Sequence, residues 1–410
     1  MGSDPGGGPG SEAESRPDPG PAGRPEAGTA DLLALRAEFP ILERCTYLVS
    51  NSLGAMPRGV RDELAAFAGA WDRRGVRAWH EGWWEMAVET GDLLAPLLGV
   101  GPGQVAMHRN VSVAAGVFLS CLDYPPERNR LVSTELEFPS LLYLAEGERR
   151  RGAEIVLVPS EDGLGIATER LLAAIDERTR VVAVSHVLFR SAFVQDAAAI
   201  AHRCREVGAL LLLDVYQSAG TLPLALAEWG VHAAVGGSVK WLCGGPGAGW
   251  LWVDPRLAPR LRPALTGWQA DEEPFAFRPG PMRPAAGAWR FLTGTPNVPA
   301  LHSCRPGYRI VAAVGAEAIR RRSLELTGRL MAAARDAGFE VRTPEAPERR
   351  GGTVSVGHPE AERLCRELLA RDIVCDFRPG AGVRLSPHFY TTEAECDHAI
   401  ATLAALRGPR

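Results

Sequence analysis

Apolar and polar positions alternate in a regular way through the middle of the chain. Short runs rich in Val, Ile and Leu have the length and composition of buried strands, and the stretches between them have the apolar spacing of helices. The strand-like runs are 105–109, 130–138, 153–160, 180–189 and 209–216, and the helix-like stretches are 139–152, 168–179 and 197–208. Apolar strands separated by helices predict an α/β fold with a mainly parallel sheet that is covered on both faces.

Several residues that can bind a ligand fall at the ends of these predicted strands. In a parallel sheet, ligands bind beyond the carboxyl ends of the strands. Earlier in the chain, Asn51 and Ser52 follow a short strand-like run and enter a turn, where they are either ligand donors or ordinary turn residues. The residues at the strand ends are Glu137, Phe138, Ser185, His186, Asp214 and Gln217.

The pattern also divides the chain into parts. Residues 1–30 are mostly Gly, Pro, Ala, Ser and acid, which predicts a disordered tail. Residues 58–299 contain the alternating pattern and form the predicted large domain. Residues 300–410, with a long helix-like stretch at 305–337, are predicted to form a smaller α+β domain. The N-terminal segment 31–57 is expected to pack with that smaller domain.

The composition adds an observation about lysine. The chain has 45 Lys and Arg residues, and Lys240 is the only lysine among them. Arginine stays protonated at any working pH, so it cannot replace a lysine whose nitrogen must lose its proton and attack. The apolar, Gly-rich surroundings of Lys240 suit an amine that forms a Schiff base with a carbonyl cofactor. The alternative is a surface lysine that is present by chance.

Asp214 supplies the second part of the expected cofactor site. It ends the run LLLLD, where a buried carboxylate is costly unless a cation meets it. A protonated pyridine nitrogen is such a cation, and the pairing keeps the ring an electron sink. Gln217 is placed to hydrogen-bond the ring oxygen and Phe138 to stack on the ring, while Ser112 begins a predicted helix that suits a phosphate. Taken singly, Asp214 and Ser112 also suit ordinary turn and cap positions.

Charge and cysteine content argue against several other classes of function. The net charge is −4 and no basic run is present, which disfavours a nucleic-acid partner and an anionic membrane surface. Eight scattered cysteines lack metal-ligand spacing, which predicts a reducing cytoplasm and no metal site. No apolar run reaches the roughly 18 residues that span a bilayer, and no signal-peptide pattern is present.

Together these residues resemble the class V, fold-type I pyridoxal-phosphate enzymes, and among them the kynureninase family most closely. The stretch 214–253 carries the most specific likeness, through Asp214, the turn Ser238-Val-Lys240 and the Gly-rich run that follows. The resemblance spans about residues 40–400. Further likenesses are YLVSNSLGAMP (47–57), VSV (111–113), FPS (138–140), SHVLFRS (185–191), GW (267–268), PFAF (274–277) and RFLTGTPNVPAL (290–301).

The resemblance implies a role for each matching residue. Lys240 is similar to the lysine that holds pyridoxal 5'-phosphate (PLP), and Arg384 is similar to the clamp for the substrate α-carboxylate, although it also suits an ordinary surface strand. Trp268 and Thr295 resemble residues that reach the phosphate of the other subunit, which implies a homodimer with shared sites. The expected cofactor-binding residues are Ser112, Phe138, Asp214, Gln217, Ser238, Lys240, Trp268 and Thr295, and the expected substrate-binding residues are Arg384, Asn51 and Ser52.

The sequence departs from the kynureninase pattern at positions near the expected cofactor. Val239 stands where the pattern has a tyrosine, and Leu141 where it has an aspartate. Leu188 and Phe189 stand where it has Asn-Tyr. The missing hydroxyl at 239 removes a phosphate contact and a proton donor, and the missing acid at 141 removes a polar contact. These departures bear on the substrate more than on the cofactor.

The leading expectation is a PLP-dependent enzyme that cleaves the Cβ–Cγ bond of an α-amino acid by kynureninase-like hydrolysis. In the expected cycle, Arg384 holds the amino acid and the freed Lys240 amine removes the α-proton, while Asp214 fixes the charge on the ring nitrogen. A class V aminotransferase and a β-eliminating lyase share these first steps and remain alternatives. A homologue that binds PLP without turnover is a further alternative, which the intact set of Lys240, Asp214 and Arg384 disfavours.

Overall fold

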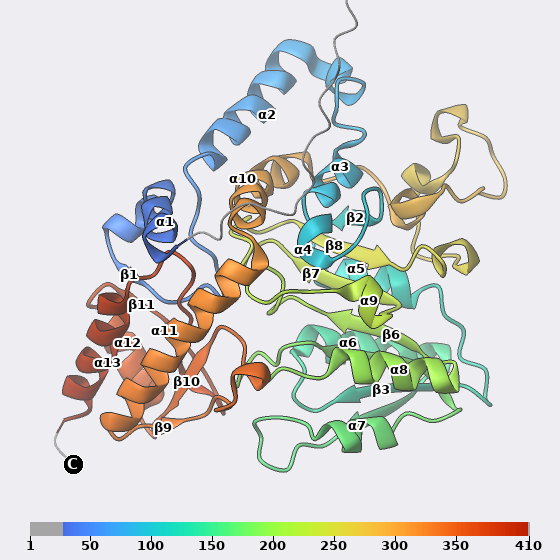
Figure 1. Cartoon of the computed structure of the whole chain (residues 1–410). Helices are drawn as coiled ribbons and strands as arrows, with labels where there is room; N and C mark the ends of the chain where they lie inside the picture. Colours follow the sequence, from blue (N-terminus) through green and yellow to red (C-terminus); the bar gives the residue numbers. More distant parts are fainter. Residues whose placement is uncertain (1–27, 409–410) are drawn as a thin grey trace, which may run out of the picture.

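The computed structural model describes residues 28–408 and is built around a seven-stranded sheet (Figure 1). Its strands are β2 (Val105–His108), β3 (Arg130–Thr134), β4 (Glu154–Val158), β5 (Thr179–Ser185), β6 (Leu210–Asp214), β7 (Ala233–Gly237) and β8 (Gly249–Val253). The spatial order is β2-β8-β7-β6-β5-β3-β4, and β8 runs in the direction opposite to the other six strands of this sheet. The expected α/β fold with a mainly parallel sheet is confirmed.

Helices pack against this sheet because its central strands are apolar on both faces. Every residue of β7 is buried, as are all but the first of β6. Helix α5 packs on β7 and β8, and α8 packs on β6. The helices of this part of the chain are α2 (Val60–Arg74), α3 (Met86–Asp92), α4 (Ala95–Leu98), α5 (Val111–Leu119), α6 (Pro139–Glu148), α7 (Thr168–Ala173), α8 (Ala197–Val207) and α9 (Leu226–Trp229).

The C-terminal part contains a second, antiparallel sheet with its own buried apolar cluster, seen in orange and red in Figure 1. Its elements are α10 (Val298–Val314), α11 (Ala316–Asp336), β9 (Glu340–Val341), β10 (Val354–Gly357), α12 (Ala361–Leu369), β11 (Ile373–Val374), β12 (Asp376–Arg378), β13 (Gly382–Leu385) and α13 (Glu393–Arg407). The strand order is β12-β13-β10-β9. The helix-like stretch expected at 305–337 is two helices, because Gly315 has φ 84° and ψ 144° and interrupts the helical backbone.

The N-terminal segment pairs with this C-terminal part. Strand β1 (Thr46–Tyr47) lies parallel to β11, and Val49 bridges to Ser386. The expected domain limits at 57 and 299 remain predictions. Of the predicted tail 1–30, residues 1–27 lie outside the described residues, and Thr29 begins helix α1 (Thr29–Ala34).

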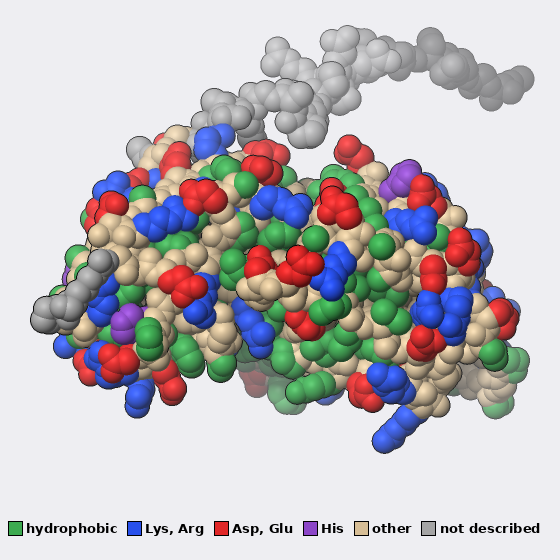
Figure 2. Space-filling view, turned by 90° about the horizontal axis from the view of Figure 1, so that it is seen from below, with side chains coloured by type: hydrophobic (Ala, Val, Ile, Leu, Met, Phe, Trp, Pro, Cys, Tyr) green, Lys and Arg blue, Asp and Glu red, His purple; other side chains and the backbone are tan. Residues whose placement is uncertain are grey.

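The surface carries charges of both signs. Figure 2 shows acidic and basic side chains interspersed over one face, without a block of one sign. Among residues 28–408, no helix has both the length and the apolar character that crossing a membrane requires.

The segment between β1 and α2 passes directly over Lys240. The N–H of Gly54 donates to the carbonyl oxygen of Val239 at 2.7 Å. A Cβ atom on Gly54 would lie 2.1 Å from the carbonyl oxygen of Lys240 and 2.9 Å from the Cα of Cys243. Only glycine allows this close approach of two backbones. The N-terminal segment therefore fixes one side of the lysine turn.

Gly54→Ala is expected to lower the free energy of unfolding by about 1–3 kcal/mol, because the added methyl group overpacks the contact with the lysine turn. Urea unfolding measures this change. Gly147→Ala is the matched control, since Gly147 lies in α6 with no atom within 4 Å of an added Cβ. Alanine there is expected to leave stability unchanged or raise it by up to about 1 kcal/mol. Equal effects of the two variants would contradict the proposed contact.

Candidate active site

Lys240 lies in the turn that follows β7. Its Nζ is 4.4 Å from the centroid of the Tyr216 ring and 5.6 Å from that of the Phe138 ring. Burial of the nitrogen lowers the pKa of Lys240 from 10.5 to about 8, Asp214 acts in the opposite direction, and Arg384 adds to the lowering. An amine with this pKa is partly unprotonated near neutral pH, so it can act as a nucleophile.

Asp214 is the last residue of β6 and is 7% exposed. Its Oδ1 accepts a hydrogen bond from the N–H of Tyr216 at 2.8 Å. Burial raises the pKa of Asp214 to about 6, although this hydrogen bond and the charge of Lys240 both lower it. Within residues 28–408, no side-chain cation lies within 4 Å of the carboxylate. The site therefore suits a ligand that brings its own positive charge to Asp214.

A second buried acid lies beside Asp214. Glu137 accepts hydrogen bonds from the N–H of Ser185 at 2.8 Å and from the hydroxyl of Thr134 at 2.9 Å. Burial raises the pKa of Glu137 to about 7, and the charge of Asp214 contributes to the rise. Ser185 and Asp214 are partners in the sheet, so both acids lie at the same edge. This pair makes the edge favourable for a cationic group.

Two aromatic side chains form a wall near the lysine. Phe138 caps the start of α6 and is 41% exposed. The ring of Phe189 meets it edge-on at a centroid distance of 5.2 Å. The accessible Phe138 ring is thus available to stack on a flat ligand near the Lys240 nitrogen.

Asn51 provides a polar group with no protein partner. The residue is 1% exposed, and neither its side-chain oxygen nor its nitrogen has a hydrogen-bond partner among the described residues. A buried amide without partners is costly, and ligand binding is one way to satisfy it. Ser52 is partly buried in the next position.

Gln217 and Ser238 are used by the protein itself. The Nε2 of Gln217 donates to the carbonyl oxygen of Asn51 at 3.0 Å, and its Oε1 accepts the indole N–H of Trp241 at 2.9 Å. The hydroxyl of Ser238 donates to the carbonyl oxygen of Ala248 at 2.7 Å. Both residues therefore hold the lysine turn in place. Their expected contacts with a cofactor remain predictions.

Ser112 is the second residue of helix α5. The helix is capped by Asn110, whose side chain accepts the N–H of Val113 at 3.0 Å. The remaining N–H groups of the first turn have no partner in the helix and suit an anion. The expected phosphate contact of Ser112 remains a prediction.

Trp268 and Thr295 lie apart from the group around Lys240. Trp268 is 42% exposed and packs against Trp84 and Phe275 at centroid distances of 4.8 and 5.7 Å. Thr295 lines a small cavity beside Arg109. No hydrogen bond or ring contact among the described residues joins Trp268 or Thr295 to Lys240.

Arg384 lies on β13 and is 2% exposed. It forms a bidentate ion pair with Asp376, with Nε to Oδ1 at 2.7 Å and Nη2 to Oδ2 at 2.5 Å. Its Nη1 donates to the carbonyl oxygen of Phe189, across the boundary with the large sheet. The structure thus brings Arg384 to the aromatic wall, and the expected carboxylate contact remains a prediction.

Two residues of this region were missed by sequence reasoning. Tyr216 follows Asp214 by two positions, so its presence in the same turn was a usable signal. Asp376 was not identifiable, because its pairing with Arg384 depends on the register of two strands.

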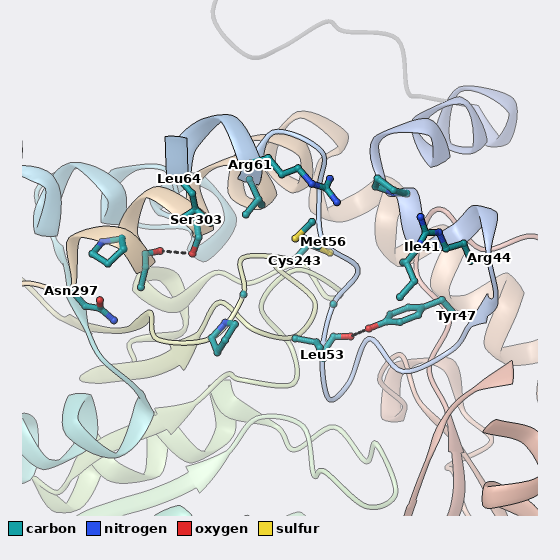
Figure 3. Close-up of a pocket in the computed structure, with 17 residues that line it drawn as sticks. Ile41, Arg44, Tyr47, Leu53, Met56, Arg61, Leu64, Cys243, Asn297 and Ser303 are labelled. Carbon is teal, nitrogen blue, oxygen red and sulfur yellow. Dashed lines mark hydrogen bonds between the residues drawn. The ribbon is translucent and has the colours of Figure 1, made fainter. Parts of the chain in front are cut away.

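A large apolar cavity is lined in part by Leu53 and Gly54 (Figure 3). Its volume is about 710 Å³, and neither Lys240 nor Asp214 lines it. Arg44 and Arg61 are its basic residues. The buried amine and carboxylate at the sheet edge are therefore separate from this cavity.

Comparison with known proteins gives the family of this chain. The aminotransferase class-V family model matches residues 56–375, which is more than half of the chain. The chain belongs to the aminotransferase class-V family. Membership confirms the expected fold type and the expected enzyme class, which depends on pyridoxal 5'-phosphate.

Relatives within the class-V family include kynureninases. The kynureninase of Burkholderia pseudomallei is 32% identical over 388 residues and covers 91% of both chains. That of Pseudomonas fluorescens is 32% identical and covers 92% of both. The fold is similar to that of the apo cysteine desulfurase of Thermococcus onnurineus, with TM-score 0.81 and 18% identity over 91% of this chain and 97% of the other. It is also similar to a cystine C–S lyase, with TM-score 0.80 and 22% identity over 89% and 99%.

The residues at the sheet edge fit the class-V cofactor. An amine with a lowered pKa can take its aldehyde, and a buried carboxylate without a contacting cation can take its ring nitrogen. The exposed Phe138 ring can cover its face, and the unpartnered Asn51 amide offers a further polar contact.

Two of the departures from the kynureninase pattern lie in the core. Leu141 is 4% exposed and Leu188 is 1% exposed, and both pack in the main apolar cluster. A charged or amide side chain there would need partners that this core does not offer. At the third departure, Val239, the backbone carbonyl oxygen accepts the hydrogen bond from the N–H of Gly54.

Asp214→Asn is expected to raise the free energy of unfolding of the cofactor-free protein at pH 7.5 by about 1–3 kcal/mol. A raised carboxyl pKa means that the contribution of Asp214 to folding is most favourable below about pH 3.8 and is lost as the pH rises through about 6. Urea unfolding of the two proteins measures the difference.

Asp254→Asn is the control for this prediction. The pKa of Asp254 is held below its usual value by hydrogen bonds from Arg256, so removal of its charge is expected to lower stability at pH 7.5. A loss of stability in Asp214→Asn as well would show that the buried charge of Asp214 does not destabilise the folded protein.

The reactivity of Lys240 toward formaldehyde and cyanoborohydride is expected to rise about tenfold per pH unit and to level off above pH 8, because only the neutral amine reacts. Mass spectrometry follows the methylation. Since Lys240 is the only lysine, Lys240→Arg leaves the N-terminal amine as the background. A rise that continues to pH 10 would contradict the lowered pKa.

Proposed function

We propose that this chain hydrolyses the Cβ–Cγ bond of an α-amino acid of the kynurenine type. The supporting observation is a 32% identity with kynureninases that covers 91% of both chains, together with an intact Lys240 and Asp214 at the sheet edge. The chain is a PLP-dependent enzyme of class V. Within that class, Cβ–Cγ hydrolysis is the proposed reaction.

The cofactor is proposed to bind between Lys240, Asp214 and Phe138, with its phosphate at the start of α5 near Ser112. When bound, PLP supplies an aldehyde and an electron-withdrawing ring that stabilises negative charge at the substrate Cα. Asp214 keeps the ring nitrogen charged, because a buried carboxylate favours a cation in contact. Phe138 covers one face of the ring and excludes water from it.

The remaining steps are assigned to side chains near Lys240. Arg384 holds the α-carboxylate of the substrate through paired N–H groups. The Nζ of Lys240, with a pKa near 8, accepts the proton from the substrate Cα. The unpartnered amide of Asn51 and the neighbouring Ser52 orient the substrate by hydrogen bonds.

A homodimer and a cytoplasmic location belong to the same proposal. Trp268 and Thr295 have no contact with Lys240 in their own chain, which agrees with a role at the partner subunit's cofactor. The eight cysteines are all free, as is usual in a reducing compartment.

β-Elimination is the second candidate, and a specific observation favours it. Leu141 and Leu188 are core residues, and Val239 has no hydroxyl, so the polar positions that would favour hydration of a γ-carbonyl are apolar in this chain. A lyase that expels a β-substituent needs no such groups. A class V aminotransferase remains a further alternative on the same grounds.

Incubation of the PLP-loaded protein with L-kynurenine is expected to give L-alanine and 2-aminobenzoate, identified by mass spectrometry, and Lys240→Ala is expected to give neither. Release of pyruvate and ammonia from L-cystine, without formation of alanine from kynurenine, would contradict the proposed hydrolysis and support β-elimination. A keto acid with the amine form of the cofactor would instead indicate transamination. If the cofactor is bound but none of these substrates gives a product, the result would support a homologue that binds PLP without turnover.

A further inference from the structure

Asp376 occupies one edge of the Arg384 guanidinium. The two residues are directly opposite each other on the antiparallel strands β12 and β13. Their side chains are 13% and 3% exposed, so the pair is well shielded from water. The two hydrogen bonds, at 2.7 and 2.5 Å, run from Nε and Nη2 to the two carboxylate oxygens. This geometry is the bidentate pairing that fixes a guanidinium plane.

The carbonyl oxygen of Phe189 fixes the same group from the large sheet, by accepting a hydrogen bond from Nη1. An arginine carries five N–H groups, and these contacts use three of them. One N–H on Nη1 and one on Nη2 are left. The two that remain are on the terminal nitrogens, which is the pair that a carboxylate engages end-on. Asp376 and Phe189 thus hold the plane of Arg384 while leaving one N–H on each terminal nitrogen for a carboxylate.

Asp376 also balances charge near the lysine. The charged groups that act on Lys240 are Asp214, Asp376, Arg378 and Arg384. Arg378 lies 3.3 Å from the Oδ2 of Asp376, so one acid faces two guanidinium groups. Without Asp376, both arginines would act on the Lys240 amine with no neighbouring acid on their own strands.

We infer that Asp376 is a positioning residue for substrate recognition, which orients Arg384 so that its free edge receives the α-carboxylate of an amino acid. This inference rests on the proposed role of Arg384 and deepens it. It does not depend on which reaction follows, because every candidate substrate carries an α-carboxylate. Asp376 touches neither the substrate nor the cofactor in this role.

Ligand titration of the PLP-loaded protein tests the inference, followed by the visible absorption of the bound cofactor. The probes are L-alanine and ethylamine, which is L-alanine without its carboxylate. Asp376→Asn is expected to weaken L-alanine binding about tenfold, equivalent to about 1.4 kcal/mol, and to change ethylamine binding less than twofold. Asp376→Ser is a second variant in case the first does not fold.

Glu393→Gln is the matched control. It breaks another ion pair of a buried arginine in the same part of the chain, that of Arg322, which is not among the charged groups that act on Lys240. This variant is expected to lose stability without changing the ratio of L-alanine to ethylamine affinity. Equal weakening of both probes in Asp376→Asn, or no weakening of either, would overturn the inference. An unchanged ratio in Arg384→Gln would overturn the role of Arg384 and the inference with it.

A second readout uses the cofactor-free protein and the methylation of Lys240. Asp376 raises the pKa of Lys240 and Arg384 lowers it. The pH midpoint of the reaction is therefore expected to fall below 8 in Asp376→Asn and to rise above 8 in Arg384→Gln. The midpoint thus reports the charge of Asp376 at Lys240, whereas the ratio of L-alanine to ethylamine affinity reports how Asp376 positions Arg384, and a merely structural Asp376 would leave that ratio unchanged. Failure of the protein to bind PLP at all would instead overturn the proposed function, while this readout would still report on Asp376.

Discussion

A buried carboxylate without a cation in contact is the constraint on which the site depends. Asp214 ends the central strand β6, where water is largely excluded, and no cation lies within 4 Å among the described residues. Lys240 acts on it from the next turn, but burial lowers the pKa of the amine while it raises that of the acid. Burial therefore shifts the protonation equilibrium of each group toward its neutral form, and a cationic ring between them favours the charged carboxylate. The cofactor of the class-V family has that property.

Three separate segments of the chain meet at Lys240. Gly54 brings the N-terminal segment against the lysine turn, and the Gln217 side chain links that segment to β6. Arg384 reaches from the C-terminal sheet to the backbone of Phe189. Because these contacts join residues far apart in sequence, the site forms only when both sheets and the N-terminal segment are in place. The low exposure of Arg384 and Asn51 follows from the same convergence.

The parts of this arrangement that sequence could predict are those set by local pattern. Apolar strands separated by helices predicted the large sheet, and a lone lysine in apolar surroundings predicted the buried amine with a lowered pKa, while its role as nucleophile stays a prediction. The break at Gly315 was missed, because helical spacing continues on both sides of it. The partners of Arg384 were also missed, since cross-strand register and contacts between sheets are tertiary properties. Sequence named Gln217 as a cofactor ligand, whereas its amide also holds two distant segments together.

The positions near the expected cofactor differ in how far they tolerate change. In the proposed function, Lys240 and Asp214 act through proton affinity, and no apolar residue can supply either function, so these two positions keep their polar groups. Leu141 and Leu188 instead contribute packing to the main core. An apolar side chain there costs nothing in folding, whereas a polar one needs a partner in the core. The fold can therefore keep its cofactor chemistry while the groups that act on the substrate side chain vary. In the proposed function, discrimination between amino acids would depend on the residues around Phe138 and Phe189, and general recognition of the α-carboxylate on Arg384.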